Sequence, residues 1–167
     1  MTVELDGYGG RNKTKGVKML YSDMVKYFES DEDIAKLLEK LSKDYFDEID
    51  SINGQLVGGI LTTSDELNKT KTQLAAIIAN LQPIYSKALS MKKQKEYRYY
   101  VVKKQSAEAS GSKFTDGSTT VEAKDAVRLY RDVRDVLCGY IKSAEALYFD
   151  CKDRTDSNRK EYGKTEK

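Results

Sequence analysis

Apolar residues recur at three- and four-residue steps along most of the chain, the spacing that places side chains on one face of an α-helix. The pattern runs from about residue 19 to 50, resumes at 63 and continues to 151. Ser30 and Asp33 have the spacing of a helix N-terminal cap, so two helices are expected to meet there. Asn53 and Gly54 are expected to end the second helix, with a short hairpin there as a minor alternative.

A second stretch opens with Thr63 and Glu66, which also have the spacing of a capping pair. Its apolar side continues to Leu89 and contains Pro83. A proline in a helix interior removes one backbone hydrogen bond and costs about 3 kcal/mol. We therefore expect a kink or a break at Pro83.

The most regular pattern follows residues 110–119, which are expected to form a loop because they are rich in serine, threonine and glycine. Thr119 with Glu122 is expected to cap the next helix. From Ala126 to Cys151 the apolar residues alternate four and three positions apart, as in a heptad seam. Either the preceding helix, in an antiparallel hairpin, or a second subunit must cover this seam. Its candidate hairpin or oligomerisation residues are Tyr130, Val133, Leu137, Tyr140, Ala144 and Leu147.

These patterns predict an all-α protein with one helical domain at 19–151, consisting of N-terminal helices (19–50) and a long antiparallel helical hairpin (63–151) able to form a coiled-coil oligomer. Residues 1–18 are expected to be a flexible basic arm, and 152–167 a fraying helix and solvated polar tail. No apolar run reaches the ~18 residues of a membrane span, and no targeting segment is recognised. We expect no membrane partner and a cytoplasmic location, in the host cytoplasm if a phage encodes the chain.

Charge changes this picture because it is unevenly distributed. The whole chain has 29 basic and 27 acidic residues, a net charge of +2. Residues 85–104 contain seven lysines and arginines against one glutamate, a net of +6, whereas residues 23–50 contain ten acids against four lysines, a net of −6. The two segments can pair with each other, within one molecule or between subunits, which is the alternative to binding an outside partner.

Tyrosines are interleaved with the cations of the basic segment. Cations neutralise phosphates, and aromatic rings stack on unpaired bases for about 1–3 kcal/mol per base. The segment therefore predicts binding of single-stranded nucleic acid. The candidate residues are Lys92, Lys93, Lys95, Tyr97, Arg98, Tyr99, Tyr100, Lys103 and Lys104.

Candidate catalytic chemistry is scarce. The chain has no histidine, the commonest general base and a frequent zinc ligand, and its two cysteines cannot build an all-thiolate zinc site. Asp44, Asp47 and Glu48 share one helix face, but without a second cluster a solvated face is favoured over a magnesium site. We expect a protein that is not an enzyme and that needs no cofactor or metal.

The basic, tyrosine-rich helix at 92–100, Ser110 with Gly111, and the heptad helix with the runs 135–139 and 141–143 together resemble the UvsY family, the recombination mediators of T4-type phages. The resemblance covers about residues 85–150. It implies a helical protein that oligomerises through its C-terminal helix, binds single-stranded DNA and helps load a recombinase onto strands coated by a single-strand-binding protein. Lys95 and Arg98 are the DNA contacts that it implies. The acidic helices have no counterpart and are interpreted as an added partner-binding module.

A competing hypothesis is a helical assembly or adaptor protein, such as a phage virion component or an inhibitor of a host defence protein. In that case the charges serve protein contacts. Arg128, Arg131 and Arg134 leave the same choice open, because they either extend the basic surface or pair with Asp132 and Asp135.

Overall fold

The computed structural model describes residues 21–165, with side chains as far as residue 161; the predicted basic arm at 1–18 lies outside this range. The described part is about 90% helical and contains no strand, which confirms the all-α prediction. Its elements are α1 (Tyr21–Met24), the 3-10 helix η1 (Val25–Phe28), α2 (Asp31–Leu41), the π-helical turn η2 (Ser42–Phe46), α3 (Asp47–Val57), α4 (Ser64–Ser110), α5 (Asp116–Ala126) and α6 (Arg128–Thr165).

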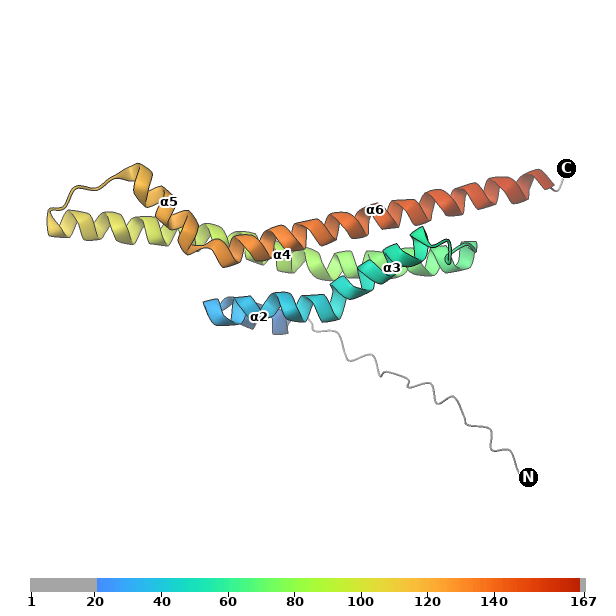
Figure 1. Cartoon of the computed structure of the whole chain (residues 1–167), viewed down its shortest axis with the longest axis horizontal. Coiled ribbons are helices and arrows are strands. Elements are labelled where there is room, and N and C mark those ends of the chain that lie inside the picture. The colour runs from blue at the N-terminus through green and yellow to red at the C-terminus, as the bar shows by residue number, and fades with distance from the viewer. Residues whose placement is uncertain (1–20, 166–167) are drawn as a thin grey trace, which may run out of the picture.

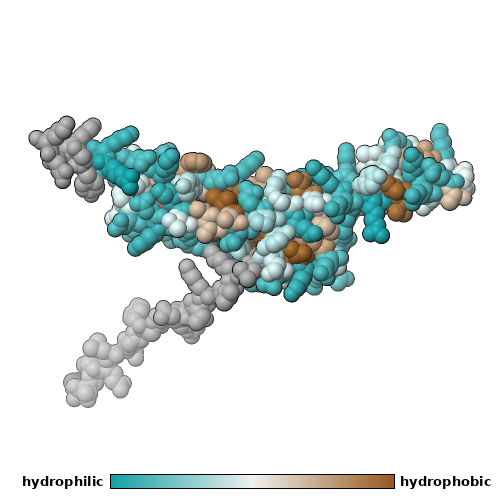
Figure 2. All heavy atoms as spheres, turned by 180° about the vertical axis from the view of Figure 1, so that it is seen from behind, coloured by the Kyte–Doolittle hydropathy of each residue, from teal (hydrophilic) through white to brown (hydrophobic). Residues whose placement is uncertain are grey.

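Helices α4 and α6 form a long antiparallel hairpin, and α2 and α3 pack along it, as Figure 1 shows. Every one of these helices contributes apolar side chains to a single hydrophobic core. Along the hairpin this core extends only as far as Ala88 on α4 and Tyr130 on α6. We call the part of the molecule that shares this core the body. Figure 2 shows that the opposite view is largely hydrophilic, with hydrophobic residues in small separate patches.

The chain itself covers the heptad seam. Tyr130, Val133, Leu137 and Ala144 are buried in the core, and Tyr140 and Leu147 are half-buried against it. These side chains meet α4 on one side and the N-terminal helices on the other. The seam is therefore a hairpin seam that faces the chain's own helices.

The seam starts one residue later than its spacing predicts. Ala126 is exposed, whereas Val127 is buried. Val127 has φ −108° and ψ 18°, which is not helical, so the chain breaks there between α5 and α6. Because of this break, Val127 rather than Ala126 is buried. The predicted unbroken seam from Ala126 is therefore wrong at its first position.

Two of the expected caps are confirmed. The Ser30 hydroxyl accepts a hydrogen bond from the Asp33 backbone N–H at 3.1 Å, so α2 begins as predicted. Thr63 and Glu66 form a reciprocal capping box at the start of α4. Each cap satisfies backbone donors that a helix would otherwise leave unpaired.

Two expected helix boundaries are wrong, and the chain does not break at Pro83. Asn53 and Gly54 lie inside α3, which continues to Val57, so the minor hairpin there does not form. Helix α4 passes through Pro83 without ending, because Pro83 and the preceding turn at Ala79 are exposed and water can satisfy the freed carbonyl. Thr119 lies within α5 and donates its hydroxyl to the Thr115 carbonyl at 2.9 Å, so it is not a cap.

The loop between α4 and α5 is shorter than its composition indicates. Helix α4 continues to Ser110 and stops at Gly111, whose φ of +66° is the left-handed conformation that glycine adopts without steric cost. The Ser112 N–H then donates to the Ala107 carbonyl at 3.0 Å, closing the helix end. The loop therefore comprises residues 111–115.

In the segment 152–167, expected to be a fraying helix and a polar tail, α6 continues to Thr165. Arg154 Nη1 donates to the Leu56 carbonyl at 3.1 Å, and Asn158 Nδ2 to the Thr62 carbonyl at 3.0 Å. Thr155 between them is buried. The polar residues of this segment satisfy the end of α3 and the link to α4, so a polar composition does not make the segment a tail.

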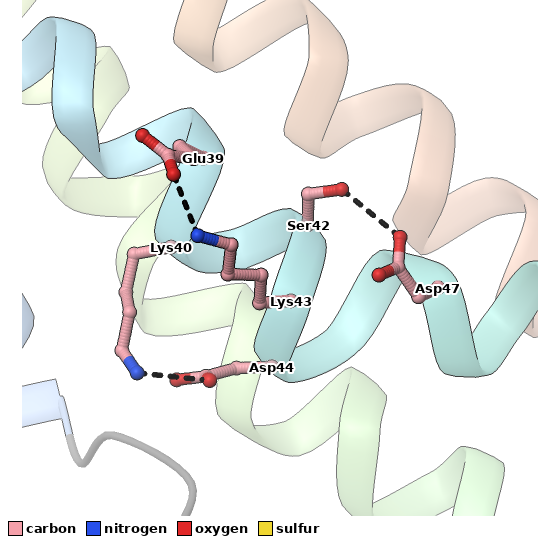
Figure 3. Close-up of polar contacts among 6 residues, drawn as sticks. All are labelled: Glu39, Lys40, Ser42, Lys43, Asp44 and Asp47. Atoms are coloured by element: carbon pink, nitrogen blue, oxygen red, sulfur yellow. Dashed lines mark hydrogen bonds and ion pairs between the residues drawn. The ribbon is translucent and has the colours of Figure 1, made fainter.

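A wide π-helical turn, η2, joins α2 to α3. Four buried residues around this turn are spaced four positions apart: Leu37, Leu41, Tyr45 and Ile49. In an α-helix, each step of four residues goes about 40° beyond one full turn. A π turn contains an extra residue and takes up this drift. Figure 3 shows the polar contacts around the turn, where Lys43 binds Glu39, Lys40 binds Asp44 and Ser42 donates to Asp47.

Candidate nucleic-acid interface

The basic segment lies mainly on an arm that projects from the body. We define the arm as residues 91–126, the distal part of α4, the loop and α5, which fold against one another and extend past the end of α2 in Figure 1. Within the arm only Thr119 and Ala123 are buried. Because so little apolar surface holds it, the arm displays most of its side chains to solvent.

One face of α4 in the arm carries two lysines and a tyrosine, with Glu96 and Glu108 one helical turn away from the lysines. At about 100° per residue, Lys93, Tyr97 and Lys104 lie within about 40° of one another. All three are exposed, and Tyr97 is 71% exposed. Neither lysine forms an ion pair with residues 21–161. We call these three residues the outer stripe.

Lys95 points away from the outer stripe, toward the body. Its Nζ donates to Asp31 Oδ1 of α2 at 3.0 Å and lies 4.3 Å from the centroid of the Tyr130 ring. Burial acts to lower the pKa of Lys95, but its contacts with Tyr130 and Asp31 prevail, and the pKa is raised. The Lys95 hydrogen bond in turn lowers the pKa of Asp31. The positive charge of Lys95 is thus paired with a carboxylate of the same chain.

Glu122 of α5 neutralises a second lysine. Lys103 Nζ lies 3.2 Å from Glu122 Oε2, and the Tyr99 hydroxyl donates to the same oxygen at 3.1 Å. Lys103 also lies over the Tyr99 ring, 5.5 Å from its centroid. The hydrogen bond from Lys103 lowers the pKa of Glu122. This cluster ties α5 to α4 and occupies one tyrosine that was expected to stack on bases.

Two more of the predicted residues are engaged within the arm. The Tyr100 hydroxyl donates to Asp116 Oδ1 at 2.5 Å, and its ring meets Phe114 edge-on with the centroids 5.6 Å apart. Lys92 pairs with Glu96 one helical turn away at 2.8 Å. The basic segment therefore divides into residues held by the chain itself and residues directed outward.

Arg98 is exposed and has no acidic partner within the described part of the chain. It borders a groove of about 380 Å³ in the angle between α4 and the α5–α6 break. The surface of the groove is mostly apolar, and Val102, which lines it, is 52% exposed. The groove is lined by Lys95, Arg98, Tyr99, Val102, Lys103, Ala126 and Val127.

The acidic segment pairs mostly with its own lysines. Asp31 is its one residue that forms an ion pair with the basic segment, as judged over residues 21–161. The other pairs are local. Asp23 lies 3.8 Å from Lys26, Asp33 3.4 Å from Lys36, Asp44 3.0 Å from Lys40 and Glu39 2.6 Å from Lys43. Wholesale pairing of the two charged segments within one molecule is therefore wrong.

Two of the three arginines at the start of α6 form ion pairs with nearby aspartates, as one of the two alternatives predicts. Arg128 lies 3.9 Å from Asp132, and Arg134 Nη2 lies 2.5 Å from Asp135. Arg131 has no acidic partner within the described residues. A continuous track of three free arginines is not present.

The carboxylates considered for magnesium are held by protein groups. No cluster of three or more metal-ligating side chains occurs among the described residues, and no helix in that range is both long and apolar enough to cross a membrane. The donors are Lys40 to Asp44, Ser42 to Asp47 and Gln73 to Glu48.

Sequence reasoning missed the two acids from other elements that form ion pairs with lysines of the basic segment. Asp31 is 64 residues from Lys95, and no local pattern connects them. Glu122 carried a local signal, but it was interpreted as a helix cap. Comparison with protein-family models, curated proteins and solved structures finds no match to this chain. The resemblance to the UvsY family therefore remains a prediction.

Proposed function

We propose that the chain is a non-enzymatic protein whose arm binds single-stranded nucleic acid. The outer stripe supports this proposal most directly, because Lys93 and Lys104 are exposed and unpaired within the described residues and flank the exposed ring of Tyr97. The two lysines are about 16 Å apart along the helix, far more than the ~3.4 Å phosphate spacing of one DNA strand. Each can therefore contact a different phosphate while Tyr97 stacks on a base.

Arg98 adds a further cation at the side of the same helix. It is exposed and lies about 100° from Tyr97 around the α4 axis. Because Arg98 lies about 120–140° from Lys93 and Lys104, a strand that follows the outer stripe must turn around α4 to reach it. Lys92, Lys95 and Lys103 contribute less in this arrangement, because each already has a carboxylate partner.

A role in phage recombination or replication is the narrower form of this proposal and follows from the UvsY-like resemblance alone. The same holds for a recombinase or a single-strand-binding protein as partner. Homo-oligomerisation through the heptad seam has less support, because the chain's own helices bury that seam. A subunit contact would need a surface other than the seam.

The test is fluorescence anisotropy with labelled oligo-dT at two salt concentrations. Lys93→Gln with Lys104→Gln should weaken binding and make the dependence of log K on log salt shallower by about 1.4, or about 0.7 per lost phosphate contact on a single strand. The matched control is Lys26→Gln with Lys36→Gln, which removes the same charge from exposed lysines on the N-terminal helices. Equal losses in both double variants would contradict a role of the outer stripe.

The second candidate is a helical assembly or adaptor protein. The groove beside Arg98 favours it, since its mostly apolar surface and half-exposed Val102 suit a protein side chain better than a phosphate. Failure of the wild-type protein to bind oligo-dT at about 50 mM salt, where phosphate contacts are strong, would favour this candidate over the first.

A further inference from the structure

Asp31 is the point at which the acidic helices touch the basic segment. It is the first residue of α2, and its Oδ1 accepts one hydrogen bond from Lys95 at 3.0 Å and another from the Tyr130 hydroxyl at 3.1 Å. Three elements therefore meet at one carboxylate: α2, the base of the arm on α4, and the start of α6. The carboxylate occupies the place at Lys95 that a phosphate would otherwise take.

We propose that Asp31 masks Lys95 and competes, within the chain, with the polyanion that the arm binds. This inference rests on the proposed function. Lys95 lies one turn before Arg98 on α4, and both line the same groove. Release of Lys95 would place it beside the unpaired Arg98 and create a second cationic pair, on the side of the helix away from Lys93.

Asp31 is placed so that it can release Lys95. Its side chain is 62% exposed, and exposed ion pairs contribute only about 0–1 kcal/mol. The start of α2 does not depend on this carboxylate, because the Ser30 hydroxyl caps it and Ile34 and Leu37 anchor it in the core. The carboxylate can therefore exchange with a phosphate while α2 stays folded.

Replacement of Asp31 by asparagine tests whether the charge of Asp31 masks Lys95. Asp31→Asn removes the negative charge but keeps an oxygen that can accept the hydrogen bond from Tyr130. We expect affinity for oligo-dT to rise about two- to fivefold, in line with the modest strength of an exposed ion pair. The dependence on salt should become steeper by about 0.7, because one additional phosphate contact forms.

The matched control is Glu39→Gln. Glu39 lies on the same helix and pairs with Lys43 at 2.6 Å, so this variant changes the net charge equally without touching the arm. It should bind oligo-dT as the wild type does. The gain from Asp31→Asn should disappear when it is combined with Lys95→Gln, because the released amine carries the gain. A gain that persists in the Lys95→Gln background would overturn the proposal.

A second measurement needs no nucleic acid. Limited acetylation followed by mass spectrometry should show faster modification of Lys95 in Asp31→Asn than in the wild type, with exposed Lys93 as the internal reference. If oligo-dT binds but Asp31→Asn matches Glu39→Gln, the masking is overturned and the proposed function stands. If no form of the protein binds oligo-dT while Lys95 labelling rises, the proposed function fails and Asp31 still shields the amine.

Discussion

Tyr140 of α6 stacks on Phe46 of η2, with the ring centroids 3.9 Å apart and the planes within 3° of parallel. Phe46 is buried, and the Tyr140 hydroxyl donates to Asp50 Oδ2 at 3.1 Å. The stack joins the π-helical turn to the hairpin at the point where α2 passes into α3. It therefore helps to hold the N-terminal helices against the hairpin.

Removal of the Phe46 ring should be costly. Phe46→Ala leaves a cavity beneath Tyr140 and should lower the free energy of unfolding by about 3–5 kcal/mol, measured by urea denaturation. Tyr140→Phe keeps the stack and loses only an exposed hydrogen bond, so its cost should not exceed about 1 kcal/mol. Comparable losses in the two variants would mean that the hydroxyl, rather than the stacked rings, is decisive.

Tyr97 should contribute to binding without contributing to stability. Tyr97→Leu removes an aromatic face that is 71% exposed, so the affinity for oligo-dT should fall by about 1–3 kcal/mol while the melting temperature is unchanged. Tyr97→Phe retains the ring and should bind as the wild type does. A loss of affinity in Tyr97→Phe would indicate that the hydroxyl makes the contact.

Pro83 should limit the stability of α4. The residue is exposed within a continuous helix, so Pro83→Ala restores a backbone donor without disturbing a packed side chain. We expect the free energy of unfolding to rise by as much as about 3 kcal/mol, the difference in helix propensity between the two residues. A decrease measured by chemical denaturation would show that the body depends on a bend at this position.

The C-terminal part of α6 should stabilise the fold through Arg154. Arg154→Ala removes the hydrogen bond to the Leu56 carbonyl and the ion pair with Asp150, at a cost of about 1–2 kcal/mol. Arg159→Ala is the control, since Arg159 is exposed and has no partner among the described residues; it should change stability by less than about 0.5 kcal/mol. Thermal melts followed by circular dichroism would distinguish the two.

Acid should destabilise the protein. Hydrogen bonds from Thr63 lower the pKa of Glu66, and the hydrogen bond from Lys103 lowers the pKa of Glu122. A carboxylate whose pKa is lower in the folded state stabilises the fold fully above its unfolded value of about 4.3, and this contribution is lost as pH falls through the folded value. The melting temperature should therefore drop as the pH falls below about 5. Glu66→Gln with Glu122→Gln should reduce the drop, and an unchanged drop would exclude these two groups as its source.

Periodicity predicted the body well because the repeat of buried side chains determines which helix faces meet. The seam residues Val133, Leu137 and Ala144 are buried as a hairpin requires, and the caps at Ser30 and Thr63 begin their helices. Composition was a poor guide to burial where contacts between helices determine which side chains are buried. Thr155 lies in a polar run, yet it is buried, because neighbouring polar side chains find backbone carbonyls of α3 and the following link.

The candidate site was predicted less completely than the fold. The spacing of Lys93, Tyr97 and Lys104 already places them on one helix face. Lys92 pairs with Glu96 at a local i,i+4 spacing, but the partners of Lys95 and Lys103 come from other elements, and no local pattern links them to these lysines. Asp31 at Lys95 is the clearest example.

The π-helical turn determines which changes in length the junction of α2 and α3 tolerates. Deletion of one residue within Ser42–Phe46 would restore ordinary α-helical winding and keep the following helix in phase, because the π turn already accommodates one extra residue. Ile49, Ile52 and Leu56 would then stay on the core face, whereas insertion of a further residue would rotate them by about 100°. The same deletion within residues 111–115 would shorten only the link between the two helices of the arm. In related chains, insertions should accumulate at the tip of the hairpin and be absent from the junction of α2 and α3, where loss of one residue is the tolerated change.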